Sequence, residues 1–330
     1  MRAAIVGTGN IALRHYNNLR SLLPECEIAV LTRNKDLANK QKKFKSSKLF
    51  FFNSSQLIDF QPQLAIICSP ASFHIELAIE LSEYPIHLFI EKPISHSIEG
   101  IDQLIKIRNN SNSLCMIGYP LRFNESMIHL RNAINEKLVG QIEEVHSKCF
   151  SYLPDWRPNI DYRNSVSAKK SLGGGVLLEL SHEIDYLRWI FGEPKIIKAE
   201  NRKNSNLEID VEDYALVEME FKNDINKNIN AELSLNFASN DLLRECLVVG
   251  KKGLLKWDGI NNEVTLKNIS QIKWQKIYTS NGKETDQMYI NELKYFLHCI
   301  KKQDAPKPDI LDAYKTLEIV LEAKLGRDKI

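Results

Sequence analysis

The chain has 330 residues, more than a single hydrophobic core usually holds, so two domains are expected. Its composition is that of a globular protein, with 43% apolar and 26% charged residues. A net charge of +2 and the lack of a long apolar run exclude a general nucleic-acid binder and an integral membrane protein. The sequence begins directly with the strand-like "MRAAIVGTGN", so no secretory leader is expected.

The six cysteines are scattered along the chain and include no CxxC or CxxH pair. That spacing argues against a structural zinc site, and we assign no metal ligands. Isolated thiols are typical of a reduced compartment, so we expect a cytoplasmic protein.

The first 120 residues alternate short apolar runs with amphipathic ones. The apolar runs predict buried strands at residues 2–7, 26–32, 64–70, 87–93 and 113–119. The amphipathic runs predict helices at residues 11–23, 71–84 and 97–110. Continuously apolar strands separated by helices are typical of a doubly wound parallel sheet covered on both faces. We therefore expect an α/β fold in a first domain of residues 1–120.

The pattern changes after residue 120. Helices are expected at residues 122–140 and 173–189, with a strand at residues 142–153 between them. Polar–apolar alternation then predicts strands at residues 213–221, 228–237, 244–250, 254–259 and 263–268. Helices at residues 288–302 and 310–326 close the chain, the second capped by Asp309. This predicts an α+β domain of residues 121–330 with a large, mostly antiparallel open sheet, whose last helices can pack back on the first domain.

The stretch "GTGNIA", Gly7 to Ala12, follows the first strand and opens the first helix. It has the G-x-G-x-x-A spacing of a dinucleotide-binding turn, in which the first glycine permits a tight turn and the second lets the backbone approach a pyrophosphate. Ala12 lets the helix pack close to the strand, and the helix N-terminus attracts the phosphates. A merely tight turn is the alternative. The candidate cofactor-binding residues are Gly7, Thr8, Gly9, Asn10 and Ile11.

The end of the second strand bears on which nicotinamide cofactor is bound. NAD sites usually carry an acid about 20 residues further on, which binds the ribose 2′-hydroxyl. Thr32, Arg33 and Asn34 stand there instead. Arg33 can pair with a 2′-phosphate through its planar fork, so NADP(H) is favoured over NAD(H). Arg14 and His15, early on the first helix, either lie near the phosphates or face solvent.

Two further strands end in residues suited to a cofactor edge, because open α/β sheets bind ligands at the carboxyl ends of their strands. Ser69 and Pro70 follow one strand, and His74 opens the next helix, where a capping or packing role is the alternative. Glu91 and Lys92 end the following strand. A lysine there can exchange a proton with a substrate hydroxyl once burial or a like charge lowers its pKa to about 7–8. Glu91 can orient the lysine or a ribose. A surface lysine before a proline turn is the alternative.

Together these motifs resemble the Gfo/Idh/MocA family, named after glucose–fructose oxidoreductase, inositol dehydrogenase and MocA. The resemblance covers nearly the whole chain, since "GYPLRF" (118–123) and "GGGVLLELSHEID" (173–185) are similar to later segments of that family. It implies a Rossmann domain followed by an α/β domain whose open sheet serves in oligomer contacts. It also implies redox chemistry on sugars or polyols, with Lys92 as catalytic acid–base and, in many members, a cis peptide bond before Pro93.

The segment that begins with three glycines carries a second candidate catalytic group. His182 and Asp185 lie three residues apart and so share a helix face. Family members commonly place an aspartate four residues before this histidine, whereas here Leu178 stands there and Glu179 is three before. The resemblance therefore implies His182 and, less directly, Glu179 as catalytic residues, with Asp185 supporting the helix or orienting His182. A satisfied core histidine is the alternative.

Residues 152–170 are rich in aromatic and cationic side chains and precede that helix. Aromatic rings stack on sugars or bases, and arginines bind carboxylate or phosphate in a bidentate manner. The substrate-binding candidates are Arg122, Trp156, Arg157, Tyr162 and Arg163. The segment resembles a subset of the family found with bacterial surface-sugar biosynthesis, which implies a nucleotide-linked or acidic sugar. A solvated surface loop is the alternative.

These expectations combine into a cytoplasmic NAD(P)-dependent oxidoreductase that transfers a hydride between nicotinamide and a hydroxyl or keto carbon of a sugar. The alternatives are a non-catalytic cofactor-binding sensor or regulatory protein, and a closed-cycle enzyme with tightly bound cofactor. No nucleic-acid or membrane partner is expected. The open sheet predicts a homodimer or homotetramer.

Overall fold

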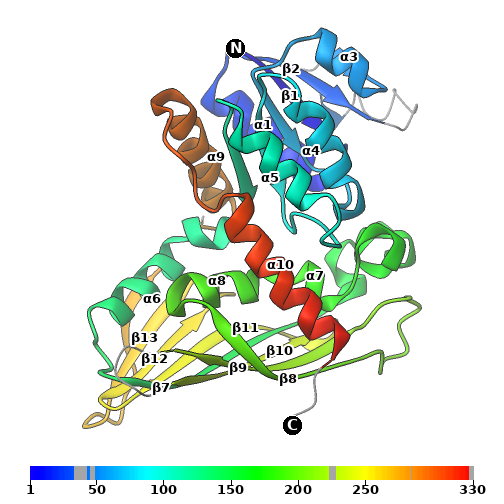
Figure 1. The fold of residues 1–330 in the computed structure, drawn as a ribbon. Coiled ribbons are helices and arrows are strands. Elements are labelled where there is room, and N and C mark those ends of the chain that lie inside the picture. Colours follow the sequence, from blue (N-terminus) through cyan, green and yellow to red (C-terminus); the bar gives the residue numbers. More distant parts are fainter. Residues whose placement is uncertain (33–42, 45–48, 223–227, 283, 327–330) are drawn as a thin grey trace. The chain divides into compact units, whose positions relative to one another are not determined.

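The computed structural model describes residues 1–32, 43–44, 49–222, 228–282 and 284–326 (Figure 1). The chain divides into two compact units. Unit 1 comprises residues 1–119 and 289–317, and unit 2 comprises residues 120–288 and the chain from residue 318. Each unit is built around a sheet of its own.

Unit 1 contains a six-stranded parallel sheet in the order β3-β2-β1-β4-β5-β6. Its strands are β1 (Arg2–Val6), β2 (Glu27–Leu31), β3 (Leu49–Phe51), β4 (Leu64–Ile67), β5 (His87–Glu91) and β6 (Cys115–Gly118). Every residue of β4 and β6 is buried, as expected for strands covered on both faces. The order 3-2-1-4-5-6 is that of a doubly wound dinucleotide-binding sheet, so the predicted fold class is confirmed for this unit.

The helices of unit 1 come from both ends of the chain. They are α1 (Asn10–Leu22), α3 (Ser54–Asp59), α4 (His74–Ser82), α5 (Ile101–Asn109), most of α9 (Glu284–Lys302) and the first half of α10 (Ile310–Leu325). α9 packs near β5, with the ring centroids of Phe89 and Phe296 6.0 Å apart. The predicted cap of α10 is confirmed, because the Asp312 amide donates to the Asp309 carboxylate at 2.9 Å.

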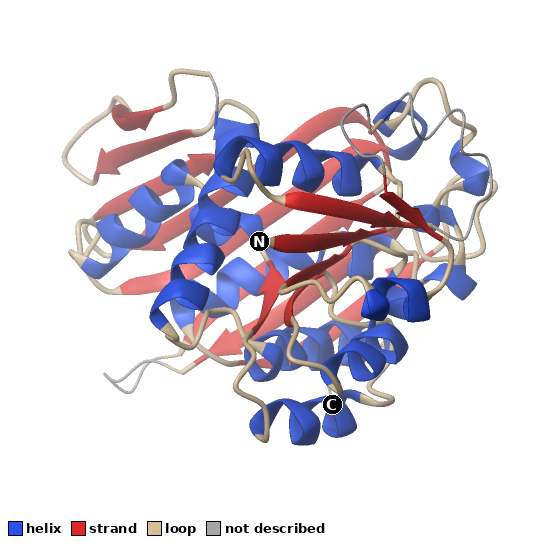
Figure 2. Cartoon of the chain, turned by 90° about the horizontal axis from the view of Figure 1, so that it is seen from above, coloured by secondary structure: helices blue, strands red, loops and turns tan. Residues whose placement is uncertain are grey.

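Unit 2 contains an eight-stranded sheet in the order β14-β13-β12-β11-β7-β10-β9-β8. Its strands, seen side by side in Figure 2, are β7 (Ile142–Tyr152), β8 (Pro194–Arg202), β9 (Tyr214–Phe221), β10 (Ile229–Asn236), β11 (Ala238–Gly250), β12 (Gly253–Asp258), β13 (Glu263–Asn268) and β14 (Gln275–Thr279). The β7–β10 pair is parallel and the other pairs are antiparallel. The predicted large, mostly antiparallel sheet is therefore confirmed.

One face of this sheet carries helices. Figure 1 shows α6 (Glu125–Asn135), α7 (Val176–Glu179) and α8 (Ser181–Phe191) on the same side of the strands. Burial alternates strictly along β9, as expected when one face packs on a core and the other does not. Trp257 of β12 is buried under α6, and its indole N–H donates to the Ser126 hydroxyl at 2.8 Å.

The structure differs from the sequence-based expectations mainly at sheet edges. β3, β8 and β14 have no predicted counterpart, and all three are edge strands of their sheets. β3 has three residues and β8 begins at a proline, so neither shows a clear strand pattern. The single helix expected over residues 173–189 is divided into α7 and α8 at Leu180. None of the described helices is long and apolar enough to cross a membrane.

Candidate functional site

The glycine turn after β1 is fixed by close backbone contacts. Gly7 has φ of +108°, and a Cβ at this position would lie 2.8 Å from the Cys68 carbonyl oxygen. Its amide donates to the Leu31 carbonyl at 2.9 Å. The turn therefore lies between the carboxyl ends of β2 and β4, and only glycine fits its backbone there.

Beyond the turn, the N-terminus of α1 is open. Gly9 is its N-cap, no side chain caps the helix, and a Cβ at Gly9 would meet nothing within 4 Å. The first backbone amides of α1, from Asn10 and Ile11, lack intrahelical partners and favour an anion at this end. Ala12 is fully buried, which lets α1 approach the sheet. These features fit the pyrophosphate of a dinucleotide.

The ends of β4 and β5 are neighbours, because Ile67 pairs with Ile90 in parallel register. Ser69 and Pro70 follow β4, and Lys92 follows β5 directly. The Ser69 hydroxyl is buried and has no hydrogen-bond partner among the described residues. All three candidates therefore lie at the edge of the sheet at which an α/β fold binds its ligand.

His74 connects these two strand ends. Its Nε2 is 2.7 Å from the Ser69 carbonyl oxygen and its Nδ1 is 3.0 Å from the Pro93 carbonyl oxygen. The side chain is almost fully buried, and this burial lowers the pKa of the imidazole. The N-cap of α4 is Phe73, so His74 does not cap the helix; its ring instead holds the loops after β4 and β5 together.

Glu91 points into the interior of unit 1. Its Oε1 is 2.5 Å from Nε2 of His15, and both residues are buried. Burial, and to a smaller extent the negative charge of Glu91, raises the pKa of the Cys68 thiol. A solvent-facing His15 was therefore a wrong alternative, because the ring lies between α1 and β5. Arg14 instead lies over the ring of Tyr289, 4.4 Å from its centroid.

Lys92 is half-buried and lies one residue beyond β5. The Lys92–Pro93 peptide bond is cis, as the resemblance implied. The charges of Glu91 and Lys92 act on the pKa of His74 in opposite directions, Glu91 raising it and Lys92 lowering it. The lysine thus belongs to one electrostatic cluster with the buried carboxylate and the imidazole.

In unit 2, the glycine turn before α7 is held on two sides. A Cβ on Gly174 would lie 2.4 Å from the Val166 carbonyl oxygen, and one on Gly175 would lie 2.3 Å from Oε1 of Glu212. Gly175 also has φ of +111°. Nζ of Lys324 lies 3.3 Å both from the Glu212 carboxylate and from the Gly174 carbonyl oxygen. These contacts fix where α7 starts.

Glu179 ends α7, and His182 lies in the first turn of α8. Both side chains are half-buried. The helix is interrupted between them at Leu180, which has φ of −98° and ψ of 23°. Glu179 and His182 therefore do not lie on one face of a continuous helix. Sequence periodicity did not indicate this break, since Leu180 is an ordinary helix former.

Arg122 and Asp185 form a buried bidentate pair. Nε of Arg122 donates to Oδ2 of Asp185 at 2.9 Å, and a second guanidinium nitrogen donates to Oδ1 at 2.7 Å. Both side chains are buried. Asp185 therefore anchors α8 to the turn that holds Arg122, and the Arg122 guanidinium has a carboxylate partner within unit 2.

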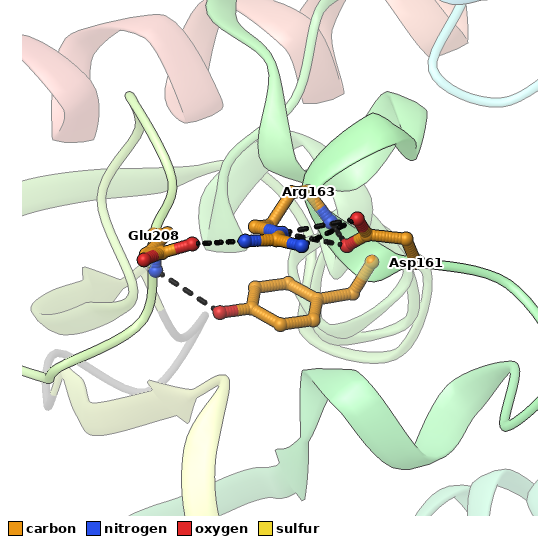
Figure 3. A network of polar contacts seen from close by, with 4 residues as sticks. Asp161, Arg163 and Glu208 are labelled. Carbon is orange, nitrogen blue, oxygen red and sulfur yellow. Dashed lines mark hydrogen bonds and ion pairs between the residues drawn. The ribbon is translucent and has the colours of Figure 1, made fainter.

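The aromatic and cationic segment is held by contacts with the rest of unit 2. Figure 3 shows Arg163 between Asp161 and Glu208, at 2.8 Å and 2.7 Å. The Tyr162 hydroxyl oxygen accepts a hydrogen bond from the backbone amide of Glu208, with an N–O distance of 3.1 Å. Trp156 donates to the Ser151 hydroxyl at 2.9 Å. Arg163 therefore already has two carboxylate partners.

Arg157 differs from its neighbours in this segment. It is exposed, and its guanidinium has no ion-pair or hydrogen-bond partner among the described residues. With Trp156, Tyr162 and four other residues it lines a cavity of only about 10 Å³, room for about one water molecule. An anionic ligand group would therefore meet Arg157 at the surface rather than inside this cavity.

Thr32 and Arg33 are the cofactor candidates that follow β2. Arg33 lies outside the described residues. Thr32 is buried, and its amide donates to the Phe51 carbonyl at 2.9 Å, which joins the end of β2 to β3. Sequence reasoning also missed the supporting roles of Glu212 and Lys324, which are ordinary charged residues of a loop and of α10 with no motif around them.

Comparison with known proteins covers both units. Residues 1–119 match "Oxidoreductase family, NAD-binding Rossmann fold", and residues 131–324 match "Oxidoreductase family, C-terminal alpha/beta domain", the two parts of Gfo/Idh/MocA proteins. The chain is 24% identical over 195 residues to myo-inositol 2-dehydrogenase of Thermotoga maritima, an alignment that spans 58% of this chain and 55% of that protein.

Two further comparisons extend over nearly the whole chain. Inositol 2-dehydrogenase/D-chiro-inositol 3-dehydrogenase of Shouchella clausii is 23% identical over 95% of this chain and 88% of its own length. The WlbA dehydrogenase of Bordetella pertussis, solved with NADH and UDP-GlcNAcA, has the same fold. Its TM-score is 0.80 at 17% identity, covering 98% of this chain and 95% of that one.

Proposed function

Because the chain belongs to the Gfo/Idh/MocA oxidoreductase family, we propose that it is an NAD(P)-dependent dehydrogenase acting on a hydroxyl carbon of a sugar. The observation that carries this proposal is Lys92, placed at the carboxyl end of β5 beside the end of β4. That edge is where a doubly wound sheet binds its dinucleotide.

The residues of the glycine turn would hold the cofactor. Gly7, Thr8, Gly9, Asn10 and Ile11 surround the open N-terminus of α1, which favours the pyrophosphate. Thr32, Ser69, Pro70, His74 and Glu91 shape the rest of the edge, the last two from the interior. When bound, the nicotinamide supplies the hydride chemistry that no side chain can.

Lys92 would exchange the proton of the substrate hydroxyl. A lysine amine accepts the hydroxyl proton in oxidation and returns it in reduction, and the supporting cluster of Glu91 and His74 fixes the strand end that carries it. His182 would assist in this proton exchange. Glu179 is the further candidate, from the end of α7.

The substrate we propose is a nucleotide-linked or acidic sugar. WlbA supports this, since it was solved with UDP-GlcNAcA, and so does Arg157, which is exposed and whose guanidinium has no partner in the described part of the chain. Trp156 and Tyr162 would border the anionic group of the substrate. Arg122 and Arg163 already bind carboxylates of the protein, so they would contribute by holding those carboxylates in place. Inositol dehydrogenases among the relatives make a free polyol the competing substrate.

We also propose a cofactor, a cellular compartment and an oligomeric state. We favour NADP(H) over NAD(H), because a buried threonine stands at the end of β2 in place of an acid. The six cysteines are free and buried, which suits a reduced cytoplasm. The face of the unit 2 sheet that none of the described helices covers suits a homodimer or homotetramer.

The test follows absorbance of reduced nicotinamide with NADP or NAD and a panel of nucleotide-linked sugars, acidic sugars and inositols. We expect turnover with a nucleotide-linked or acidic sugar, lowered about a hundredfold to ten-thousandfold in Lys92→Met. Cofactor affinity, measured separately by titration, should stay unchanged. Lys106→Met, at an exposed position of α5, is the control.

The other results would redirect the proposal. Loss of both turnover and cofactor binding in Lys92→Met would make the lysine structural. Cofactor binding without turnover of any sugar would favour a sensor. Cofactor that co-purifies and changes redox state only within the protein would favour the closed-cycle enzyme.

A further inference from the structure

A lysine that follows β2 reaches back to the glycine turn. Nζ of Lys43 donates to the Thr8 carbonyl oxygen and to Oδ1 of Asn10, both at 3.2 Å. Thr8 and Asn10 are the second and fourth residues of the GTGNIA turn. A full positive charge therefore lies at the opening of α1, where the helix N-terminus already favours an anion.

The residue after Lys43 explains why its ammonium is there. Phe44 is completely buried, and its ring packs edge-on against Tyr16 of α1 at a centroid distance of 5.2 Å. Tyr16 lies nearly two turns into α1, so Phe44 attaches this part of the chain to the same helix whose first turn Lys43 contacts. Core packing of the neighbouring Phe44 therefore helps to place Lys43 at the turn, in addition to its contacts with Thr8 and Asn10.

The position of Lys43 relative to the strands of the unit 1 sheet indicates which part of the cofactor it would contact. It lies in the chain between β2 and β3, and both strands are on the β2 side of β1 in the sheet order. In this fold the end of β2 is the adenosine-ribose side, whereas the nicotinamide lies toward β4. A cation on that side, near the turn, is suited to a phosphate on the ribose 2′-position.

We propose that Lys43 binds the 2′-phosphate of NADP(H) and thereby makes the protein select NADP(H) over NAD(H). This inference rests on the proposed nicotinamide-dependent function and adds a selectivity residue to it. The partners that Lys43 contacts at the turn are neutral oxygens of a carbonyl and an amide. A dianionic phosphate would compete well with them for the ammonium.

The test is a binding titration that needs no substrate. Affinities for NADPH and NADH are measured by calorimetry or fluorescence in the wild-type chain and in Lys43→Gln, which keeps a donor for the turn but removes the charge. Lys106→Gln, at an exposed lysine of α5, makes the same charge change elsewhere in unit 1. We expect Lys43→Gln to weaken NADPH binding about 10- to 100-fold and NADH binding less than about twofold.

Two mononucleotides separate the 2′-phosphate from the pyrophosphate. Adenosine 2′,5′-bisphosphate carries the first group and ADP carries only the second. We expect Lys43→Gln to weaken binding of the bisphosphate and to leave the affinity for ADP unchanged. The inference would be overturned if the variant lost affinity equally for both mononucleotides, or equally for NADPH and NADH. Lys43 would then bind the pyrophosphate and not the 2′-phosphate.

The remaining outcomes also decide the matter. If Lys43→Gln binds all four ligands as the wild type does, the inference is wrong while the nicotinamide function stands. If the wild-type chain binds neither NADPH nor NADH, the proposed function fails first and the inference fails with it.

Discussion

At the scale of single residues, His74 shows how one buried imidazole can bind two loops. Both of its nitrogens face carbonyl oxygens, from Ser69 and Pro93, yet a neutral imidazole has only one N–H to donate. Protonation would satisfy both carbonyls, and burial opposes protonation strongly enough to lower the pKa. The neutral ring with a single donated hydrogen bond is therefore the form favoured at neutral pH.

This pKa shift predicts how stability depends on pH. The ordinary pKa of histidine is 6.5, and the folded state lowers it, so the unfolded chain binds this proton more tightly. The contribution of His74 is fully present above about pH 6.5 and is lost as pH falls toward the folded-state pKa. Thermal unfolding from about pH 8 to about pH 5 should therefore show a steeper fall for the wild type than for His74→Gln.

The comparison includes a matched histidine. His146→Gln makes the same replacement at a partly exposed histidine of β7 and is the control for the substitution itself. Parallel profiles for the wild type and His74→Gln would show that the buried ring does not titrate differently in the folded state.

At the scale of elements, the turn before α7 leaves little room for any residue larger than glycine. Gly175 combines a positive φ with a Cβ position 2.3 Å from the Glu212 carboxylate, whereas Gly192, at the end of α8, has φ of +92° and open space around its Cβ position. The backbone penalty of alanine should be similar at the two sites, on the order of 1–2 kcal/mol. Only Gly175→Ala must also displace a half-buried ion pair.

We therefore expect Gly175→Ala to lower the free energy of unfolding by about 1–3 kcal/mol more than Gly192→Ala does. Urea unfolding of the two variants measures the difference directly. Equal losses would mean that Glu212 and Lys324 move aside without cost, and that these two residues do not fix the start of α7.

The elements that sequence predicted well are those whose pattern is local. The strands β1, β2, β4, β5 and β6 show as apolar runs because both of their faces are covered, and β9 and β10 show as alternation because one face is not. Edge strands such as β14 have little buried surface to enforce a pattern, so they were missed. The oxidoreductase family and the fold class were recovered from the glycine turn and the strand ends.

What sequence could not predict depends on contacts between distant segments. Nothing near Glu91 in the chain indicates that its partner is His15, 76 positions earlier. The same holds for Arg122 with Asp185 and for Lys324 with Gly174, 63 and 150 positions apart. Sequence reasoning therefore proposes candidate residues for the site more readily than it predicts the partners that hold them.

At the scale of the whole molecule, the face of the unit 2 sheet left uncovered by the described helices is relevant to assembly. Leu247, Val249 and Leu254 point to that face from β11 and β12, and Val249 pairs directly with Leu254. The ion pair between Lys256 and Glu245 lies on the same face, at 2.6 Å. An apolar centre beside paired charges is typical of a protein–protein interface.

We therefore expect the protein to be a dimer or tetramer in solution, and Leu254→Glu to weaken that assembly. A carboxylate at the centre of an apolar contact would lose its hydration without gaining a partner, so the dissociation constant should rise at least about tenfold. Analytical ultracentrifugation over a dilution series measures this. Leu325→Glu, at a leucine that is 88% exposed at the end of α10, makes the same change away from the sheet and should leave the dissociation constant unchanged. A wild-type chain that sediments as a monomer at every concentration would refute the assembly itself. An oligomer equally weakened by both variants would show that net charge, and not the face of the sheet, governs association.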